Sequence, residues 1–286
     1  MKIGIAGLGK MGINHLNELR KDDEFKVAAL YDLRQSAEFK EPFYTNLDEF
    51  LKTNLDIVII ATPTSTHLEL AKAILAKVKC VLIEKPLAMN LKEMNKIKEL
   101  AKKHESSVAV GFSERFNPAI LALKKELANE KIISINIKRY SPFPARISDV
   151  GILQDLSIHD IDLVGFLSGE SFAKQGLLSL KKDDREIEAI ITLQSGLNSK
   201  QNIIAAVHQS WNCALKIRLV SVITENAFFE ADLNNFSLQK NGLPLALQGA
   251  SPLFSEHKEL LGLAKSGKMG RLASIKDALN AQACLE

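Results

Sequence analysis

The sequence predicts an α/β protein in which a parallel sheet covered by helices is followed by an α+β domain with an open, mainly antiparallel sheet. Residues 1–119 alternate short apolar runs with amphipathic segments, a pattern typical of parallel strands that alternate with helices. Beyond them the apolar runs become longer and indicate antiparallel strands. The chain has 286 residues, which is long enough for two hydrophobic cores. We therefore expect two domains, residues 1–119 and residues 120–286.

The elements of the first domain follow from its apolar periodicity. Apolar runs predict strands at residues 2–6, 26–31, 57–61, 80–84 and 108–112. Amphipathic segments predict helices at residues 10–21, 66–77, 91–104 and 117–128. Two of these helices begin with a side chain that can cap the first turn, followed three residues later by an acid, namely Thr66 with Glu69 and Asn90 with Glu93.

The second domain reads as a sheet with helices on one face. Strand-like runs lie at residues 131–140, 186–194, 202–210, 214–223 and 226–232. A helix is expected at residues 152–167, and two more close the chain at residues 254–265 and 274–284.

A glycine-rich turn joins the first strand to the first helix. Gly7 suits the tight turn, Gly9 leaves room for a pyrophosphate, and Gly12 permits close packing of helix on strand. Asp32 ends the next strand, where a carboxylate binds ribose hydroxyls and repels a 2′-phosphate. We therefore expect a Rossmann domain that binds NAD rather than NADP, although Arg34 lies close enough to favour NADP. The alternative is a tight turn with a capping acid and no ligand.

Two further motifs carry polar groups. Glu84-Lys85-Pro86 ends the fourth strand, at the edge where parallel sheets bind ligands. In the helix at residues 152–167, Asp155, His159 and Asp162 share one face and Asp160 points elsewhere. Taken singly, the first motif is more typical of a solvated surface pair, and the second of a polar helix stripe.

Together these motifs resemble the Gfo/Idh/MocA family of oxidoreductases. The resemblance rests on Gly7–His15 (GxGxMGxxH), Ala61-Thr62-Pro63, Glu84-Lys85-Pro86, Gly111-Phe112, Arg115-Phe116-Asn117-Pro118 and Asp155-xxx-His159, which occur in the family's order and spacing. It implies that Lys85 and His159 meet at the nicotinamide and that the Lys85–Pro86 bond is cis. It also implies cofactor contacts from the glycine turn, Asp32, Arg34 and the following residues: Lys10, Met11, Ala61, Thr62, Pro63, His67, Glu84 and Lys85.

The chemistry of alcohol oxidation agrees with this assignment. A secondary alcohol must lose a hydride from carbon and a proton from oxygen, so the site needs a base and a cation beside the developing alkoxide. Histidine titrates near neutrality, which makes His159 the expected base. Lys85 supplies the charge or shares in moving the proton. Asp155 orients the imidazole or binds a neighbouring hydroxyl, and Asp162 is a weaker candidate for the same role.

The stretch from Arg139 to Gly151 bears on the substrate. It resembles the loop of a family subgroup that oxidises C3 of UDP-N-acetylglucosamine or its uronic acid, supplying a 3-keto sugar to an aminotransferase. Arg139 and Arg146 would then bind an anionic group such as a diphosphate. Arg115 and Asn117 are expected to line the same cleft, although Asn117-Pro118 also reads as an ordinary helix start. Taken alone, the loop reads equally well as a proline-containing connector with exposed arginines.

Two other functions stay open. In the first, the substrate is a free polyol or monosaccharide, such as inositol, and Arg139 and Arg146 have no role in binding it. A non-catalytic NAD(H)-binding sensor is the second alternative, but such a protein has no need of Lys85, Asp155 and His159.

The composition excludes several classes of binding partner. Lys and Arg number 37 against 34 Asp and Glu, without a basic cluster, so nucleic acid is not expected. Cys80, Cys213 and Cys284 are widely separated and no metal-ligand motif occurs, so neither disulfides nor a metal are expected. The apolar runs are too short to span a bilayer and no basic leader precedes the first strand, so we expect a cytoplasmic protein without a membrane partner. An exposed sheet face would suit a homo-oligomer, a dimer or a tetramer.

Overall fold

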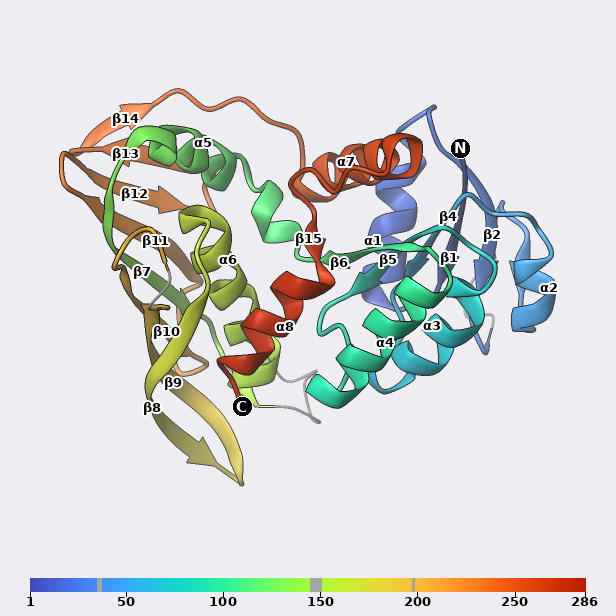
Figure 1. Cartoon of the computed structure of the whole chain (residues 1–286), viewed down its shortest axis with the longest axis horizontal. Helices are drawn as coiled ribbons and strands as arrows, with labels where there is room; N and C mark the ends of the chain where they lie inside the picture. Colours follow the sequence, from blue (N-terminus) through green and yellow to red (C-terminus); the bar gives the residue numbers. More distant parts are fainter. Residues whose placement is uncertain (35–37, 145–150, 197–198) are drawn as a thin grey trace. The chain divides into compact units, whose positions relative to one another are not determined.

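Two units make up the fold, and each contains its own sheet (Figure 1). The computed structural model describes residues 1–34, 38–144, 151–196 and 199–286. The first unit comprises Met1–Ser113 and Leu253–Leu279, and the second comprises Glu114–Pro252 and Asn280–Glu286. This division differs from a single boundary after residue 119, because part of the C-terminal segment returns to the first sheet. There β15 (Ala273–Ser274) pairs antiparallel with β6 (Ser107–Gly111).

The sheet of the first unit has the order β15-β6-β5-β4-β1-β2-β3. Its other strands are β1 (Lys2–Ala6), β2 (Lys26–Tyr31), β3 (Phe43–Tyr44), β4 (Ile57–Ile60) and β5 (Cys80–Glu84), and β1 to β6 run parallel. The strands expected from the sequence are confirmed to within one residue, while β3 and β15 are too short for a periodic signal. The order reverses between β1 and β4, so a ligand crevice is expected at their carboxyl ends.

Helices flank this sheet at α1 (Lys10–Leu19), α2 (Leu47–Leu51), α3 (His67–Leu75), α4 (Leu91–Lys103) and α7 (Pro252–Ser266). The cap predicted for α4 is confirmed, because Asn90 Oδ1 accepts the Glu93 N–H at 3.0 Å. The cap predicted at Thr66 is wrong. Its hydroxyl donates to the Pro63 carbonyl at 2.8 Å and leaves the first turn of α3 without a side-chain cap, because residues Thr64–Thr66 form a 3₁₀ turn.

The second unit contains the sheet β14-β13-β12-β11-β7-β10-β9-β8. Its strands are β7 (Ile132–Tyr140), β8 (Phe172–Lys182), β9 (Arg185–Ser195), β10 (Ile204–Ser210), β11 (Ile217–Thr224), β12 (Phe228–Asp232), β13 (Ser237–Lys240) and β14 (Leu243–Leu245). Apart from the parallel pair β7 and β10 the strands pair antiparallel, so the mainly antiparallel sheet is confirmed. The sequence did not indicate β8, since an edge strand that is largely exposed lacks an alternating apolar pattern.

The helices of this unit are α5 (Pro118–Glu126) and α6 (Ile158–Ser168). Helix α5 contacts β12 and β13, and helix α6 contacts β7 and β10. Short 3₁₀ turns flank α5 at Ser113–Phe116 and Leu127–Asn129, and α8 (Ile275–Ala283) lies near the C-terminus. Within the described ranges, no helix combines the length and the apolar character needed to cross a bilayer.

The helix expected at residues 152–167 is not uniform. Leu153–Ser157 form a π-helical turn, and regular α6 begins only at Ile158. Such wide turns are rare and occur frequently at functional sites. The helix ends in the expected manner, with Gly169 in the left-handed conformation at φ +77°.

Candidate functional site

A pocket of about 760 Å³ opens at the carboxyl edge of the first sheet. It brings together nine of the residues predicted to bind the cofactor, namely Gly7, Gly9, Met11, Asp32, Ala61, Thr62, Pro63, Glu84 and Lys85. They come from the ends of β1, β2, β4 and β5, where the strand order reverses. The local motifs therefore converge on one site because parallel strands end at the same edge of the sheet.

The glycine turn is shaped for a ligand that approaches the backbone closely. Gly7 has φ +94°, and a Cβ there would lie 2.6 Å from the Thr62 nitrogen. A Cβ on Gly12 would overlap the Gly7 carbonyl oxygen, so this glycine lets α1 pack on the turn. A Cβ on Gly9 would meet nothing within 4 Å, which leaves the N-terminus of α1 accessible. Free N–H groups at such a helix end bind phosphate, so the residues fit the pyrophosphate of a dinucleotide.

Asp32 stabilises the turn as well as lining the pocket. Its Oδ2 accepts the Leu8 N–H at 2.7 Å, which ties the end of β2 to the glycine turn. Arg34 is exposed and is not among the residues that line the pocket.

Three more predicted cofactor residues lie outside the lining. Lys10 is exposed at the start of α1, and Gly12 is buried beneath the turn. His67 is fully buried, with Nδ1 3.0 Å from the Pro86 carbonyl and Nε2 2.9 Å from the Thr62 carbonyl. The expected cofactor contact of His67 is therefore corrected, because this side chain joins the loops that follow β4 and β5. Burial lowers the pKa of His67 below the usual histidine value.

Lys85 follows β5 and lines the pocket while half-buried. The Lys85–Pro86 peptide bond is cis, as the family resemblance implies. The neighbouring Glu84 is buried, and its Oε1 lies 2.8 Å from His15 Nε2. A Cβ on Gly111 would lie 2.7 Å from the same oxygen, so only glycine leaves room for this carboxylate.

The second unit holds the other predicted catalytic residues. Asp155 belongs to the π-helical turn and His159 to the first turn of α6, and both side chains are half-buried. The turn is held on the sheet by Ser157, whose hydroxyl donates to Gln209 Oε1 at 2.8 Å. Lys85 and His159 belong to different units, so their predicted meeting at the nicotinamide stays a prediction.

Asp162 and Arg115 form a buried ion pair with each other. Arg115 Nε donates to Asp162 Oδ2 at 2.7 Å, and Nη2 donates to Oδ1 at 2.5 Å. Both side chains are nearly inaccessible. This two-pronged pair engages both groups. The roles predicted for them, Asp162 orienting the imidazole and Arg115 binding substrate, stay predictions.

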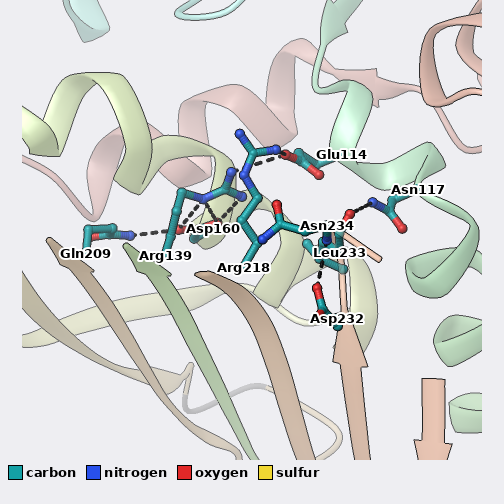
Figure 2. Close-up of polar contacts among 9 residues, drawn as sticks. All are labelled: Glu114, Asn117, Arg139, Asp160, Gln209, Arg218, Asp232, Leu233 and Asn234. Atoms are coloured by element: carbon teal, nitrogen blue, oxygen red, sulfur yellow. Dashed lines mark hydrogen bonds and ion pairs between the residues drawn. The ribbon is translucent and has the colours of Figure 1, made fainter. Parts of the chain in front are cut away.

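Arg139 is also buried rather than free for a diphosphate. Figure 2 shows its guanidinium directed at the Asp160 carboxylate. It donates to Asp160 at 2.6 Å and to Glu114 at 3.1 Å. Burial lowers the pKa of Arg139, but the two carboxylates outweigh burial and raise it above the usual value. The expected diphosphate contact of Arg139 is therefore corrected. Arg146 lies outside the described residues.

Asn117 caps α5 and is buried, which corrects its expected place in a substrate cleft. Its Oδ1 accepts the Ala119 N–H at 3.0 Å, and its Nδ2 donates to the Leu233 carbonyl at 3.0 Å (Figure 2). The reading of Asn117-Pro118 as a helix start is the correct one. In the described part of the chain, no three His, Cys, Asp or Glu side chains are grouped to hold a metal ion.

Residues 1–112 match the Gfo/Idh/MocA family model, described as an oxidoreductase family with an NAD-binding Rossmann fold. This part of the chain belongs to the Gfo/Idh/MocA family. The pocket, the glycine turn, Asp32 and Lys85 all lie within or beside the matched residues, so the NAD-binding fold accounts for the geometry of the first unit.

Curated relatives include sugar and polyol dehydrogenases. The myo-inositol 2-dehydrogenase of Thermotoga maritima is 31% identical over 185 residues, which cover 59% of this chain and 55% of that protein. The UDP-N-acetylglucosamine 3-dehydrogenase of Acidithiobacillus ferrooxidans is 31% identical over 176 residues, with the same coverage of 59% and 55%. The chain thus spans about half the length of the curated relatives it matches.

Solved structures show the same fold over the whole chain. The Acidithiobacillus ferrooxidans UDP-N-acetylglucosamine 3-dehydrogenase superposes with a TM-score of 0.86 at 22% identity, covering 100% of this chain and 99% of that one. GenD2 from gentamicin A biosynthesis, solved in complex with NAD, superposes with a TM-score of 0.85 at 19% identity, covering 100% and 92%. The fold of both units is therefore shared with these two solved structures.

The sequence missed part of the pocket wall. Its additional lining residues are Tyr31, Leu33, Leu47, Thr66, Glu69 and Leu70. One signal was available, because Leu33 directly follows Asp32, the residue predicted to bind the ribose. Tyr31 ends β2 and Thr66 belongs to the 3₁₀ turn before α3, whereas Leu47, Glu69 and Leu70 lie on α2 and α3. None of these five residues carries a local motif for a ligand.

Proposed function

We propose that this protein is an NAD-dependent oxidoreductase that oxidises a secondary alcohol of a sugar-like substrate to a ketone. The observation that carries the proposal is the place of Lys85, which lines the same pocket as the glycine turn and Asp32. Lys85 thus lines, at the carboxyl end of β5, the pocket that we propose for the dinucleotide.

The first unit provides the cofactor site in this proposal. The N-terminus of α1 and the turn at Gly7 and Gly9 would hold the pyrophosphate. Asp32 would accept hydrogen bonds from the adenine ribose hydroxyls. Its charge repels a 2′-phosphate, and Arg34 is outside the pocket lining, which supports NAD over NADP.

Protein groups manage the proton, while bound NAD supplies the hydride acceptor. His159 would take the proton from the substrate hydroxyl as the alkoxide forms. Lys85 would stabilise the developing negative charge at that oxygen. Asp155 precedes His159 by one turn and would orient the imidazole or bind a neighbouring hydroxyl.

For the substrate, we propose C3 of a UDP-N-acetylglucosamine-type nucleotide sugar. A curated relative at 31% identity and a solved structure with a TM-score of 0.86 are both UDP-N-acetylglucosamine 3-dehydrogenases, which supports this choice. A free polyol is the second candidate, because a myo-inositol 2-dehydrogenase is also 31% identical.

Assembly and partners follow from the second unit. Large apolar side chains are exposed on its sheet strands, including Leu178 at 73% and Ile204 at 58%. Association of this sheet with a second copy would remove that surface from water, so we propose a homo-oligomer. An aminotransferase is the proposed partner reaction, because it would consume a 3-keto sugar. The proposed compartment is the cytoplasm, which accords with Cys80 and Cys284 being buried free thiols.

The test is NADH formation by the purified protein with UDP-N-acetylglucosamine, its uronic acid, free N-acetylglucosamine or myo-inositol. Each assay is run with and without an aminotransferase plus glutamate, which removes the ketone and draws an unfavourable oxidation forward. Signal with a UDP-sugar alone supports the nucleotide-sugar proposal. Turnover of inositol favours the polyol candidate, and bound NAD without turnover of any alcohol contradicts the enzyme proposal.

A further inference from the structure

Arg218 on β11 is held in place by a carboxylate without being buried. Its Nη1 donates to Glu114 Oε1 at 2.9 Å, yet 45% of the side chain is exposed (Figure 2). Among the described residues, Glu114 is its one carboxylate partner, and no hydrogen bond occupies Nε or Nη2. A guanidinium fixed at one nitrogen and free at two others is preorganised for an anion.

Arg218 stands beside Arg139 on the neighbouring strand. The two residues are direct register partners in the antiparallel pair of β11 and β7. Both donate to Glu114 Oε1, and Arg139 is further neutralised by Asp160, which also accepts from Gln209 Nε2 at 2.9 Å. The buried arginine therefore has its own carboxylate, whereas Arg218 shares one and faces solvent.

Arg218 also lines a pocket of about 400 Å³ in the second unit. A second cation, the exposed Lys216, lines the same pocket, and no carboxylate lies within 4.0 Å of its ammonium in the described ranges. A second wall is formed by Asp232, the last residue of β12, and by Asn234 and Asn235 in the turn that follows it.

That wall is locked by its own hydrogen bonds. Asp232 accepts the N–H groups of Asn234 at 2.8 Å and Asn235 at 3.2 Å, and the Asn235 side-chain amide at 2.6 Å. Asn234 Nδ2 donates to the Lys216 carbonyl at 3.0 Å, which ties the turn to β11. The Asp232 carboxylate is thus occupied by the turn rather than by Lys216 or Arg218.

A chain of ion pairs connects this pocket to the first turn of α6. It runs from Arg218 through Glu114 and Arg139 to Asp160, the residue after His159 (Figure 2). Each link lies within the second unit. The ion pairs therefore fix the position of Arg218, and of a ligand that it binds, relative to the helix that carries the proposed base.

We propose that this pocket binds the diphosphate of the nucleotide-sugar substrate. Lys216 and Arg218 contact the phosphate oxygens, as a point charge and a planar fork respectively. The Asn234 and Asn235 side-chain oxygens accept hydrogen bonds from ligand hydroxyls. This inference rests on the proposed nucleotide-sugar function and moves the diphosphate contact from the buried Arg139 to its exposed neighbour.

The test uses the full chain with NADH bound and titrates it with UDP and with inorganic phosphate, by calorimetry. Arg218→Gln and Lys216→Gln are each expected to weaken UDP binding about tenfold, the effect of losing one charge-assisted contact. Lys131→Gln is the control, because Lys131 is an exposed lysine that pairs with Glu225 outside the pocket. Lys216→Gln breaks no ion pair of the described structure, so it separates lost binding from lost folding.

A second readout is the KM for UDP-N-acetylglucosamine, which is expected to rise in both variants while the KM for NAD does not change. Equal UDP affinity in wild type and variants overturns the inference, as does a wild type that binds neither UDP nor phosphate. If UDP binding follows the variants but no UDP-sugar is oxidised, the anion pocket stands and the proposed reaction fails.

Discussion

Glu84 Oε1 lies 2.8 Å from His15 Nε2, and both side chains are buried in the first unit. His15 Nδ1 in turn lies 2.8 Å from Nε2 of His257, which α7 contributes. Three elements far apart in sequence, namely α1, β5 and α7, therefore meet at Glu84, the residue before Lys85. Since Glu84 is the residue next to Lys85, this buried chain of side chains positions the loop that carries the proposed catalytic cation.

We expect His15→Phe to destabilise the protein, because it leaves the Glu84 carboxylate buried without its partner. Breaking one member of a buried pair costs about 3 kcal/mol in the free energy of unfolding. Urea unfolding measures the loss. The matched control is His208→Phe, whose pair with Glu188 is half-exposed at 3.0 Å and is expected to contribute less than about 1 kcal/mol. Equal losses in the two variants would contradict the buried-pair assignment.

The free energy of unfolding is expected to fall as the pH drops from about 6.5 to about 5. Burial, followed by the nearby His15, holds the pKa of His257 well below 6.5, and burial also lowers that of His67. In this pH range the unfolded chain therefore binds more protons than the folded chain does. Each histidine adds a slope of up to about 1.4 kcal/mol per pH unit. His257→Gln should flatten the pH dependence, and an unchanged slope would sink this explanation.

Substitutions in the glycine turn should separate folding from binding. Gly12→Ala would overlap the Gly7 carbonyl and is expected to cost about 3 kcal/mol of stability. Gly9→Ala meets no atom within 4 Å, so it should fold normally but weaken NAD binding about tenfold by filling the pyrophosphate site. Thermal unfolding and NADH fluorescence titration measure the two effects. Gly262→Ala, on α7 with open space around it, is the control for both.

Asp32→Asn should change the cofactor preference without opening the turn. The amide oxygen can still accept the Leu8 N–H, while the negative charge is lost. We expect the ratio of kcat/KM for NAD to that for NADP to fall about tenfold, because a charged acceptor becomes neutral and the repulsion of the 2′-phosphate disappears. A ratio equal to that of the wild type would remove the assigned role of Asp32.

Lys85→Ala and His159→Ala are each expected to lower kcat about a hundredfold or more while NAD still binds. The reason is that one removes the cation beside the alkoxide and the other removes the base. Steady-state NADH formation and equilibrium NAD binding provide the two readouts. Lys92→Ala, an exposed lysine on α4, should behave as wild type. Substantial turnover in either active-site variant would refute the catalytic assignment.

Much of the first unit could be predicted because its information is local. A strand, a glycine turn and a helix occupy consecutive residues. The turn can therefore be predicted from the spacing of Gly7, Gly9 and Gly12 without reference to distant parts of the chain. Asp32 and Lys85 follow the same logic, since parallel strands bring their carboxyl ends to one edge.

Charged residues of the second unit were harder to interpret, because their partners are remote. Arg139 reads as a surface charge in sequence, and only the packing of α6 on β7 and the path of the chain before α5 bring Asp160 and Glu114 to it. Arg115 and Asp162 are 47 residues apart, and no periodic pattern links them.

The sequence by itself determined the pattern of strands and helices and the glycine turn of the Rossmann fold, because these depend on backbone preferences within a few residues. The tertiary structure decided which charges are buried, which arginine lines a pocket, and that α7 supplies His257 to the contact between His15 and Glu84. Those outcomes depend on strand register and on contacts across long stretches of chain, which local patterns do not encode.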